Sequence, residues 1–382
     1  MVLLFLMLEF ENPLVLFVFV LLIVSAIVQL FYYLGIFSRL AFYKPAAASN
    51  FSDLPPVSVI IAARNEYKNL EKNLKLILEQ DYPSFEVIVV NDCSWDDSQK
   101  LLEYYQEQYP QLKICTLIEQ EKYPTGKKFA LTIGIKAAQY QEMIFTDADC
   151  IPASNQWLRL MQSKFSTSKE IVLGYSPYKK QNSFLNLFIR FESIFTATAY
   201  FSAAILKRPF MGVGRNLAYT RDLFFKHKGF AKHQHILSGD DDLHVNQTAT
   251  ATNVAIQLDP QSFMLSEPKK NFEEYRRQKA RHNSTGKYYK FSDQLYLGGY
   301  YFSHLLFYVT CVLLLVFNFN WQVVLGIFGF RFLVQTAVFI GILKRLKDIH
   351  LVWFIAILDL VYLIYIFIFG TIGLVSKQKK IW

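Results

Sequence analysis

The sequence predicts an α/β fold, in which a mostly parallel sheet flanked by helices is joined to one N-terminal and about three C-terminal transmembrane helices. Two observations predict it. Between residues 57 and 146, short β-branched runs alternate with segments of helical periodicity, which is typical of a parallel sheet covered on both faces. The chain is also 53% hydrophobic, above the share of a soluble domain, and the surplus lies near its two ends.

Residues 1–43 are expected to form an N-terminal transmembrane anchor. Residues 14–37 are almost uncharged and long enough to cross a bilayer. A secretory signal peptide is the alternative, but this stretch is too long for one, no basic segment precedes it, and no clear cleavage site follows. Residues 44–56 are rich in Ala, Ser and Pro, and we expect a linker there.

Residues 291–382 repeat the apolar signal in three stretches, at 295–317, 321–343 and 351–375. The positive-inside rule places the basic residues between the last two stretches in the cytoplasm, and with them the polar middle of the chain. Those residues are Lys344, Arg345 and Lys347. Four spans would leave the basic tail, Lys377, Lys379 and Lys380, outside. Either one C-terminal stretch does not span, or the tail is an exception to the rule.

The net charge of +9 has two readings, a nucleic-acid partner or a basic surface against anionic lipid headgroups. Beside membrane spans we expect membrane lipids and no nucleic acid. The four cysteines show no C-x-x-C spacing. They are therefore expected to be free thiols in a reducing compartment.

The polar middle, residues 57–290, is expected to form one domain. Its first strand covers residues 57–61, and Asn65 is expected to cap the helix that follows, where Leu70, Leu74 and Ile77 recur at helical spacing. Further strands are expected at 86–90, 113–118 and 143–146, and further helices at 96–105 and 127–138.

Polar or acidic clusters follow three of these strands, at 64–66, 91–92 and 147–149. Ligands of parallel sheets bind beyond the carboxyl ends of the strands, so one crevice is expected to collect all three clusters. Asp147 and Asp149, one residue apart, form a seat for a hard divalent cation, with a polar strand end as the alternative. No G-x-G-x-x-G and no P-loop motif occurs, which disfavours a dinucleotide oxidoreductase and a P-loop NTPase.

The order of these motifs resembles a family 2 glycosyltransferase with the GT-A fold, over roughly residues 55–285. The resemblance rests on four stretches taken in order: Val57-Ser58-Val59-Ile60-Ile61 with Asn65-Glu66, Val89-Val90-Asn91-Asp92, Gly126-Lys127 with Ala130-Leu131, and Asp147-Ala148-Asp149. Each motif is loose, and their ordered co-occurrence is specific.

The resemblance implies a donor site. Glu66 and Asp92 match positions that hold the nucleoside of a sugar nucleotide; the alternatives are a first-turn acid favoured by the helix dipole and a turn former. Lys127 matches a lysine near the donor diphosphate. Three alternatives remain for Lys128: it is the exposed neighbour of Lys127, it meets the diphosphate in place of Lys127, or both lysines are solvated. Asp149 matches the more direct metal ligand and Asp147 the acid near the donor sugar, with Mg²⁺ or Mn²⁺ as the cation.

The resemblance also implies a catalytic base within residues 238–243. When the family's leucine, three positions after the base, is aligned with Leu243, the base role falls to Asp240; Asp241 is the alternative. Gly239 stands where the family usually has Glu, which is a departure. An acidic cluster at a helix N-terminus is the alternative.

Two further segments follow from the resemblance. Gln278 and Arg281 match the first and fourth positions of the family's Q-x-x-R-W, and His282 replaces the aromatic residue. Arg281 is expected to meet the diphosphate and Gln278 the acceptor or the metal-bound donor; a basic helix on the membrane surface is the alternative. The glycines of 212–218 would admit a sugar. Residues 184–206 are expected to lie in the membrane interface plane, with a core helix as the alternative.

The function that the resemblance implies is an inverting sugar transfer. The donor is a nucleoside-diphosphate sugar, with uridine inferred from the family's habit, and the acceptor is a lipid-linked or membrane-proximal saccharide or lipid. We expect an integral protein of the bacterial inner (cell) membrane with a cytoplasmic catalytic domain. A processive polysaccharide synthase is one alternative, disfavoured by His282. A non-catalytic scaffold or sensor is another, disfavoured by the retained acids.

Overall fold

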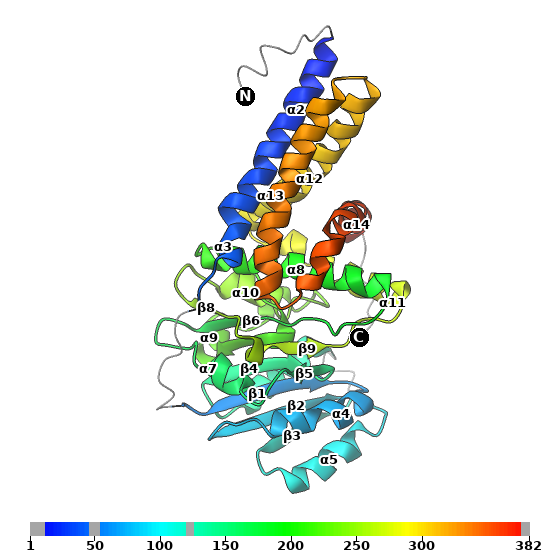
Figure 1. The fold of residues 1–382 in the computed structure, drawn as a ribbon. Helices are drawn as coiled ribbons and strands as arrows, with labels where there is room; N and C mark the ends of the chain where they lie inside the picture. The colour runs from blue at the N-terminus through cyan, green and yellow to red at the C-terminus, as the bar shows by residue number, and fades with distance from the viewer. Residues whose placement is uncertain (1–11, 46–53, 120–125, 376–382) are drawn as a thin grey trace.

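The computed structural model describes residues 12–45, 54–119 and 126–375, and only the backbone over 369–375. Most of the expected linker and the basic tail lie outside these residues. A sheet with its covering helices forms one half of the molecule, and three long helices rise from it as a bundle (Figure 1).

The main sheet has seven strands in the order β3-β2-β1-β4-β7-β6-β8. They are β1 (Val57–Ala63), β2 (Phe85–Asp92), β3 (Leu112–Leu117), β4 (Glu142–Asp147), β6 (Ile171–Gly174), β7 (Leu217–Thr220) and β8 (Val254–Gln257). Only β7 runs antiparallel to its neighbours. A separate antiparallel pair joins β5 (Cys150–Pro152) to β9 (Met264–Ser266). The expected mostly parallel sheet is confirmed.

Both faces of the sheet are covered, because successive side chains of a strand point to opposite sides. Val59 and Ile61 of β1 pack with α4 (Tyr67–Leu78), α5 (Ser98–Gln108) and α7 (Trp157–Gln162). Ile60, between them, packs on the other face with α6 (Lys127–Ala137) and α8 (Phe184–Ile205). Burial on both faces explains why the strand carries an unbroken apolar run instead of an alternating pattern.

The expected cap of the first helix is wrong. Asn65 has a φ of +56° and lies before the helix, which begins at Tyr67. Its side-chain oxygen accepts a hydrogen bond from the Trp95 backbone N–H (2.9 Å), while the Tyr67 N–H donates to Asp96 (3.1 Å). The cap is therefore supplied by the loop after β2, which is distant in sequence.

Helix α8 lies between the sheet and the long apolar helices (Figure 1), and most of its side chains are buried. Two buried ion pairs hold it: Arg190 with Asp348, in the turn after α13, and Glu192 with Lys279 of α11 (Phe272–Asn283). The domain is completed by α9 (Arg221–Lys226) and α10 (Asp242–Thr248). The position of α8 in the membrane interface plane stays a prediction.

The apolar ends of the chain form helices. They are α2 (Pro13–Leu30), which continues through a π-helical segment (Phe31–Phe37) into α3 (Ser38–Ala41), then α12 (Phe291–Val316), α13 (Trp321–Arg345), a 3₁₀ segment (Ile349–Phe354) and α14 (Ile355–Val375). Within the described residues, four stretches are long and apolar enough to cross a membrane: Pro13–Ala41, Phe291–Val316, Trp321–Arg345 and Ile349–Ile368.

A buried polar network ties these helices together. The Arg331 guanidinium on α13 donates to Asp359 of α14 (2.8 Å) and to Gln29 and Tyr33 (both 2.9 Å). His304 of α12 lies 2.9 Å from the same guanidinium. Because an unpaired charge among apolar helices is costly, this set of partners fixes how the helices fit together.

Candidate active site

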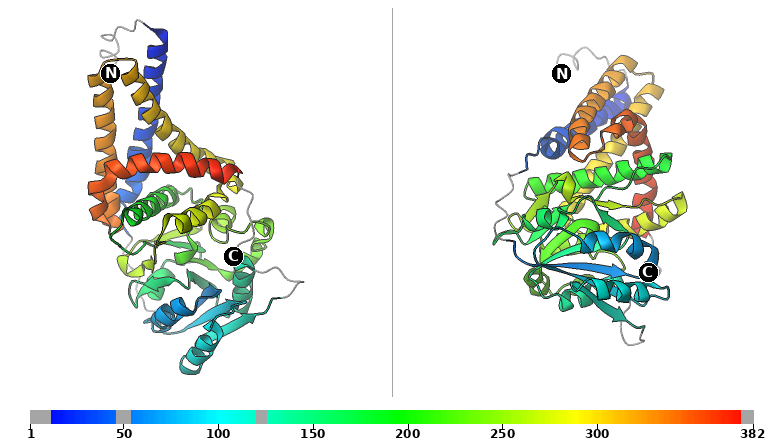
Figure 2. Two further views of the ribbon diagram at one scale, coloured as in Figure 1. Left: turned by 90° about the vertical axis from the view of Figure 1, so that its right-hand side faces the viewer. Right: turned by 60° about the horizontal axis from the view of Figure 1, so that its bottom comes forward.

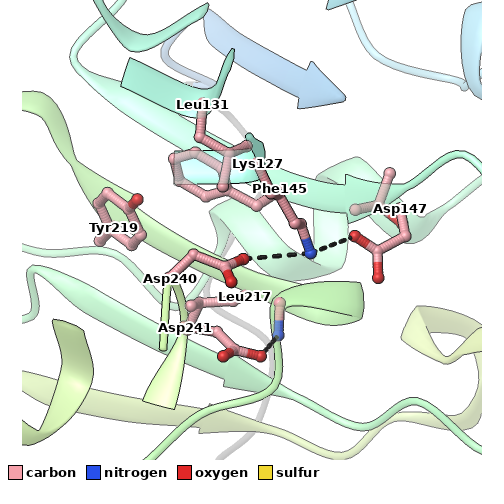
Figure 3. Close-up of a pocket in the computed structure, with 10 residues that line it drawn as sticks. Lys127, Leu131, Phe145, Asp147, Leu217, Tyr219, Asp240 and Asp241 are labelled. Atoms are coloured by element: carbon pink, nitrogen blue, oxygen red, sulfur yellow. Dashed lines mark hydrogen bonds and ion pairs between the residues drawn. The ribbon is translucent and has the colours of Figure 1, made fainter. Parts of the chain in front are cut away.

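Three separate segments bring charged side chains into one cavity beside the sheet (Figure 3). Lys127 opens α6, directly after Gly126, whose φ of +132° is one that favours glycine. Asp147 ends β4, and Asp240 precedes α10. The residues that line the cavity are Lys127, Leu131, Phe145, Thr146, Asp147, Gly214, Leu217, Tyr219, Asp240 and Asp241.

The Lys127 ammonium lies between two of these carboxylates. Its Nζ is 2.8 Å from Asp147 Oδ1 and 3.1 Å from Asp240 Oδ2. The two oxygens are therefore at most about 6 Å apart, although 93 residues separate them in sequence. Burial opposes the charge of Lys127, but Asp147 and Asp240 raise its pKa above the usual value. Likewise, burial alone would raise the pKa of Asp240, yet Lys127 holds it below the usual value.

The three consecutive acids occupy three different environments. Asp240 faces Lys127 in the cavity and is 9% exposed. Asp241 accepts from the Gly214 N–H (2.7 Å) and caps α10 by accepting from the Asp242 N–H (2.8 Å). Burial, with the charges of Asp240 and Asp242, raises the pKa of Asp241 to about 7. Of the two acids that the sequence left open for the base role, Asp240 is the one that faces the Lys127 ammonium.

Asp242 is turned away from the cavity. It accepts hydrogen bonds from the hydroxyls of Tyr289 (2.7 Å) and Thr285, and from the Leu243 N–H (2.7 Å). Thr285 also donates to the His282 carbonyl at the end of α11 (2.8 Å). Asp242 therefore connects the start of α10 to the chain after α11.

The departure at Gly239 has a steric reason. Its φ is +91°, and a Cβ there would lie 2.5 Å from the Leu243 side chain. A glutamate could not take this backbone conformation without strain. Because Gly239 has no side chain, the backbone can pass close to Leu243 just before Asp240.

Asp149 and Glu66 lie close to Asp147 at the same edge of the sheet, although neither lines the cavity. Burial and the Asp147 charge raise the pKa of Asp149, with Arg215 partly offsetting them. Burial also raises the pKa of Glu66, and the charges of Asp149 and Asp147 add to that effect. Carboxylates that repel each other in this way suit a divalent cation with oxygen ligands. Among the described residues, no group of three or more His, Cys, Asp or Glu side chains forms a complete metal site.

Three of the expected donor residues are not among those that line the cavity. Asp92 is buried at the end of β2, paired in register with Leu117. Gln278 is half-buried and Arg281 exposed on α11. His282, the departure from the family pattern, follows Arg281; desolvation of its ring and the charges of Lys279 and Arg281 hold its pKa well below the usual value, and the charges of Arg215 and Lys127 add to this. The cavity lining thus includes Lys127, Asp147 and Asp240, and the donor-binding roles of Asp92, Gln278 and Arg281 stay predictions.

The two adjacent lysines, whose roles the sequence left open, are separated by the structure. Lys127 faces the acids, whereas Lys128 is only 5% exposed and donates to the carbonyls of His233 (2.6 Å) and Ile236 (2.9 Å). Burial lowers the pKa of Lys128 to about 8. Lys128 therefore holds the loop that leads to Asp240, a role that sequence reasoning missed.

Arg215 is a second residue that sequence reasoning missed. Its guanidinium lies 4.3 Å from the centre of the Tyr178 ring and donates to the Ser176 carbonyl (3.3 Å). Its charge acts on both Asp149 and Asp147. The sequence signal is the position of Arg215 within the glycine-containing stretch before β7, between Gly214 and Asn216.

Comparison with known proteins relates part of this chain to a described family. Residues 58–226 match the family model described as glycosyl transferase family 2. This match identifies residues 58–226 as a family 2 glycosyltransferase segment. The matched region covers β1 to α9 and therefore includes Lys127, Asp147 and Arg215, while Asp240 lies beyond it.

Curated relatives of this chain carry glycosyltransferase names. Glycosyltransferase AglE of Haloferax volcanii is 30% identical over 214 residues, which is 54% of this chain and 64% of the relative. A poly-beta-1,6-N-acetyl-D-glucosamine synthase of Staphylococcus epidermidis is 29% identical over 115 residues, which is 30% of this chain and 26% of the relative. The chain thus spans less than two thirds of either relative.

The structure of mannosyltransferase PcManGT from Pyrobaculum calidifontis is similar to this chain over nearly its whole length. The TM-score is 0.57 at 16% identity, with 92% of this chain and 99% of that chain covered. This likeness shows the fold, and the expected GT-A-type sheet with apolar helices at both ends is confirmed.

Proposed function

We propose that this chain transfers a sugar from a nucleoside-diphosphate donor to a lipid-linked or membrane-proximal acceptor. One observation carries the proposal. Lys127 lies within ion-pair distance of both Asp147, the first acid of the Asp147-Ala148-Asp149 motif (D-x-D), and Asp240, the expected base. A cation between a metal-binding acid and a base is suited to a reaction in which a diphosphate leaves as a hydroxyl attacks.

In this mechanism Asp240 is the general base. It takes the proton from the acceptor hydroxyl while that oxygen bonds to the anomeric carbon of the donor sugar. The bond from the anomeric carbon to the diphosphate oxygen breaks in the same displacement, so the configuration inverts and the nucleoside diphosphate leaves. No covalent enzyme intermediate is needed, and a single carboxylate base suffices. Lys127, which keeps Asp240 ionised, is also placed to meet the diphosphate.

Asp149 and Asp147 would hold a divalent cation, Mg²⁺ or Mn²⁺. When bound, this ion offsets the negative charge that grows on the leaving diphosphate. Support comes from the mutual repulsion of the two carboxylates and from PcManGT, whose structure is described as a complex with GDP-Man and Mn²⁺. Arg215 would offset the charge that remains when the ion is absent.

Continuity between the site and the membrane helices supports a lipid-linked acceptor. One buried core runs from Leu131 of α6 through Phe195 of α8 to Phe339 of α13. The catalytic domain is therefore packed directly on the helices that would lie in the bilayer, and not tethered at a distance from them. An acceptor held by a lipid would meet the site without leaving the membrane surface.

The test uses membranes that carry the full chain, incubated with labelled UDP- and GDP-sugars plus Mg²⁺ or Mn²⁺. Label in the lipid fraction is expected, and both Asp149→Ala and Asp240→Asn are expected to remove it. Asp222→Asn, an exposed acid on α9, is the matched control and should transfer like the unchanged chain. Equal label with Asp240→Asn would contradict the proposal.

A processive polysaccharide synthase is the second candidate, favoured by the match to the poly-beta-1,6-N-acetyl-D-glucosamine synthase. The same assay separates the two functions, because a synthase places the label in polymer of high mass. No label above the Asp240→Asn control with any donor would instead favour a non-catalytic scaffold.

A further inference from the structure

Helix α14 differs in direction from the other three helices that are apolar enough to span a membrane. Helices α2, α12 and α13 rise together from the catalytic domain (Figure 1), whereas α14 runs across them, along the top of the domain (Figure 2, left). Length and composition alone do not distinguish α14 from its neighbours. Its packing does.

Side chains along α14 stay in contact with the domain. Near its start, Asp359 accepts from Arg331 of the bundle (2.8 Å). Three residues on, the Tyr362 ring centre lies 4.7 Å from that of Phe195 of α8, and three residues further Tyr365 lies 5.5 Å from Phe188. Each step along α14 therefore meets an earlier residue of α8, so the two helices run alongside each other in opposite directions.

The second domain helix, α11, holds the same part of α14. The Tyr365 ring lies 6.4 Å from the Tyr275 ring, and the Asn283 amide lies 3.4 Å from the Tyr365 hydroxyl. A helix rises about 1.5 Å per residue, so a helix leaving the domain at Asp359 would carry Tyr365 about 9 Å away from it. Tyr365 instead contacts α8 and α11 of the catalytic domain.

The opposite face of α14 and of the segment before it is apolar and exposed. Trp353, Ile357, Leu360, Ile364 and Phe367 recur at spacings of four and three residues, and their exposed fractions run from 49% to 83%. This spacing places them on one helical face. An uninterrupted apolar stripe of this kind is unfavourable in water.

The stripe continues the surface that the bundle presents to its surroundings. Phe17 and Ile27 of α2, Val312 of α12 and Leu333 of α13 are large apolar side chains exposed by 51–68%. A bilayer that covers them would also cover the α14 stripe, which lies beside the domain end of the bundle (Figure 2, left). Between Ile355 and Val375, α14 carries no Lys or Arg, and its one acid, Asp359, is buried.

We propose that α14 does not cross the membrane but lies in the leaflet nearest the catalytic domain, with its exposed stripe among the lipid acyl chains. The chain then has three spans, and α14 ends on the same side as the domain. This removes the conflict with the positive-inside rule, because Lys377, Lys379 and Lys380 follow on the side of Lys344 and Arg345.

Two nitroxide pairs test the direction of α14 in the full-length protein, reconstituted in phosphatidylethanolamine and phosphatidylglycerol vesicles. Labels at Leu360→Cys and Phe367→Cys report on α14, and labels at Val309→Cys and Val316→Cys report on α12, all exposed positions. Each pair is seven residues apart, about 10 Å along a helix. Depth is measured from collisions with oxygen and with a water-soluble nickel reagent.

The α12 pair is expected to differ in depth by nearly the full 10 Å, and the α14 pair by a few ångströms at a shallow depth. A depth difference in α14 equal to that in α12 would overturn the proposal. Labels on α14 shielded from both reagents would also overturn it, because a second copy of the chain would then cover the stripe.

A second experiment counts the crossings without relying on depth. Single cysteines replace Ser292, Asn318 or Lys379 in a chain whose native cysteines are changed to alanine, and a membrane-impermeant maleimide is applied to sealed vesicles of each orientation. Ser292 and Asn318 lie at opposite ends of α12. Lys379→Cys is expected to react together with Ser292→Cys; reaction together with Asn318→Cys would refute three spans. Neither experiment measures transfer, so each outcome is independent of the proposed activity.

Discussion

Replacing Lys127 by methionine is expected to slow transfer most at low pH. The substitution removes the ammonium that lies 3.1 Å from Asp240, while methionine keeps a similar length. Asp240 is 9% exposed, and burial raises its pKa when no cation compensates. Without Lys127, Asp240 should hold its proton to a higher pH and fail as a base over that range.

The size of the effect follows from the distance. Two unit charges 3.1 Å apart interact by about 5 kcal/mol at an effective dielectric constant of about 20. At about 1.4 kcal/mol per pKa unit, that is an upper limit of about four units on the pKa of Asp240. Solvent and Lys128 reduce it, so we expect the acid limb of the kcat/KM profile to move upward by about one to three pH units.

The assay is the pH dependence of kcat/KM between roughly pH 5 and pH 9, where the lower limb reports the base of the free enzyme. Lys136→Met, at an exposed position on the same helix, is the matched control and should reproduce the parent profile. If Lys127→Met lowered kcat/KM by the same factor at every pH, this reasoning would be refuted, because the lysine would then act on the donor alone. If Lys127→Met left kcat/KM unchanged, Lys127 would act neither on Asp240 nor on the donor diphosphate.

Three structural predictions accompany this one. Asp242→Asn should lower the free energy of unfolding by about 1.5–3 kcal/mol for each weakened charge-assisted hydrogen bond, seen as a lower thermal midpoint in detergent. Lys128→Met leaves two loop carbonyls without their donor, at about 1–3 kcal/mol each, so hydrogen exchange should accelerate over residues 231–239. Gly174→Ala would place a Cβ 2.4 Å from the Asn216 side chain and should destabilise by about 1–3 kcal/mol, whereas Gly298→Ala, with open space around it, should not. A midpoint unchanged by Gly174→Ala, or exchange unchanged by Lys128→Met, would contradict the packing described.

Most of the fold was predictable because its signals are local. The buried run at β1 and the apolar periodicity of α4 each lie within a few consecutive residues, so burial on two faces or on one could be inferred directly. The cap of α4 was not predictable in this way. Asn65 fits the pattern of a capping residue, but a loop from a distant part of the sequence provides the bond to Tyr67.

The same difference between local signals and distant contacts applies to the candidate site. Motif order identified Asp147, Asp149 and Asp240 as candidates, since each stands at the end of a recognisable element. It favoured Lys127 over Lys128 and Asp240 over Asp241 but left the neighbours open as alternatives, because adjacent side chains differ only in where the fold directs them. Nor did it find the role of Arg215, which depends on Tyr178 and the D-x-D together.

By itself, the sequence determined the fold class, the family resemblance and the number of segments apolar enough to enter a membrane, because these depend on composition and spacing along the chain. The tertiary structure alone decided which lysine meets the acids, which acid faces it and in which direction α14 runs. Those properties depend on contacts between residues tens to hundreds of positions apart, and no local pattern records them. Asp359 illustrates the difference: in sequence it is one acid in an apolar stretch, and in the structure it pairs with Arg331 at the point where α14 meets the bundle.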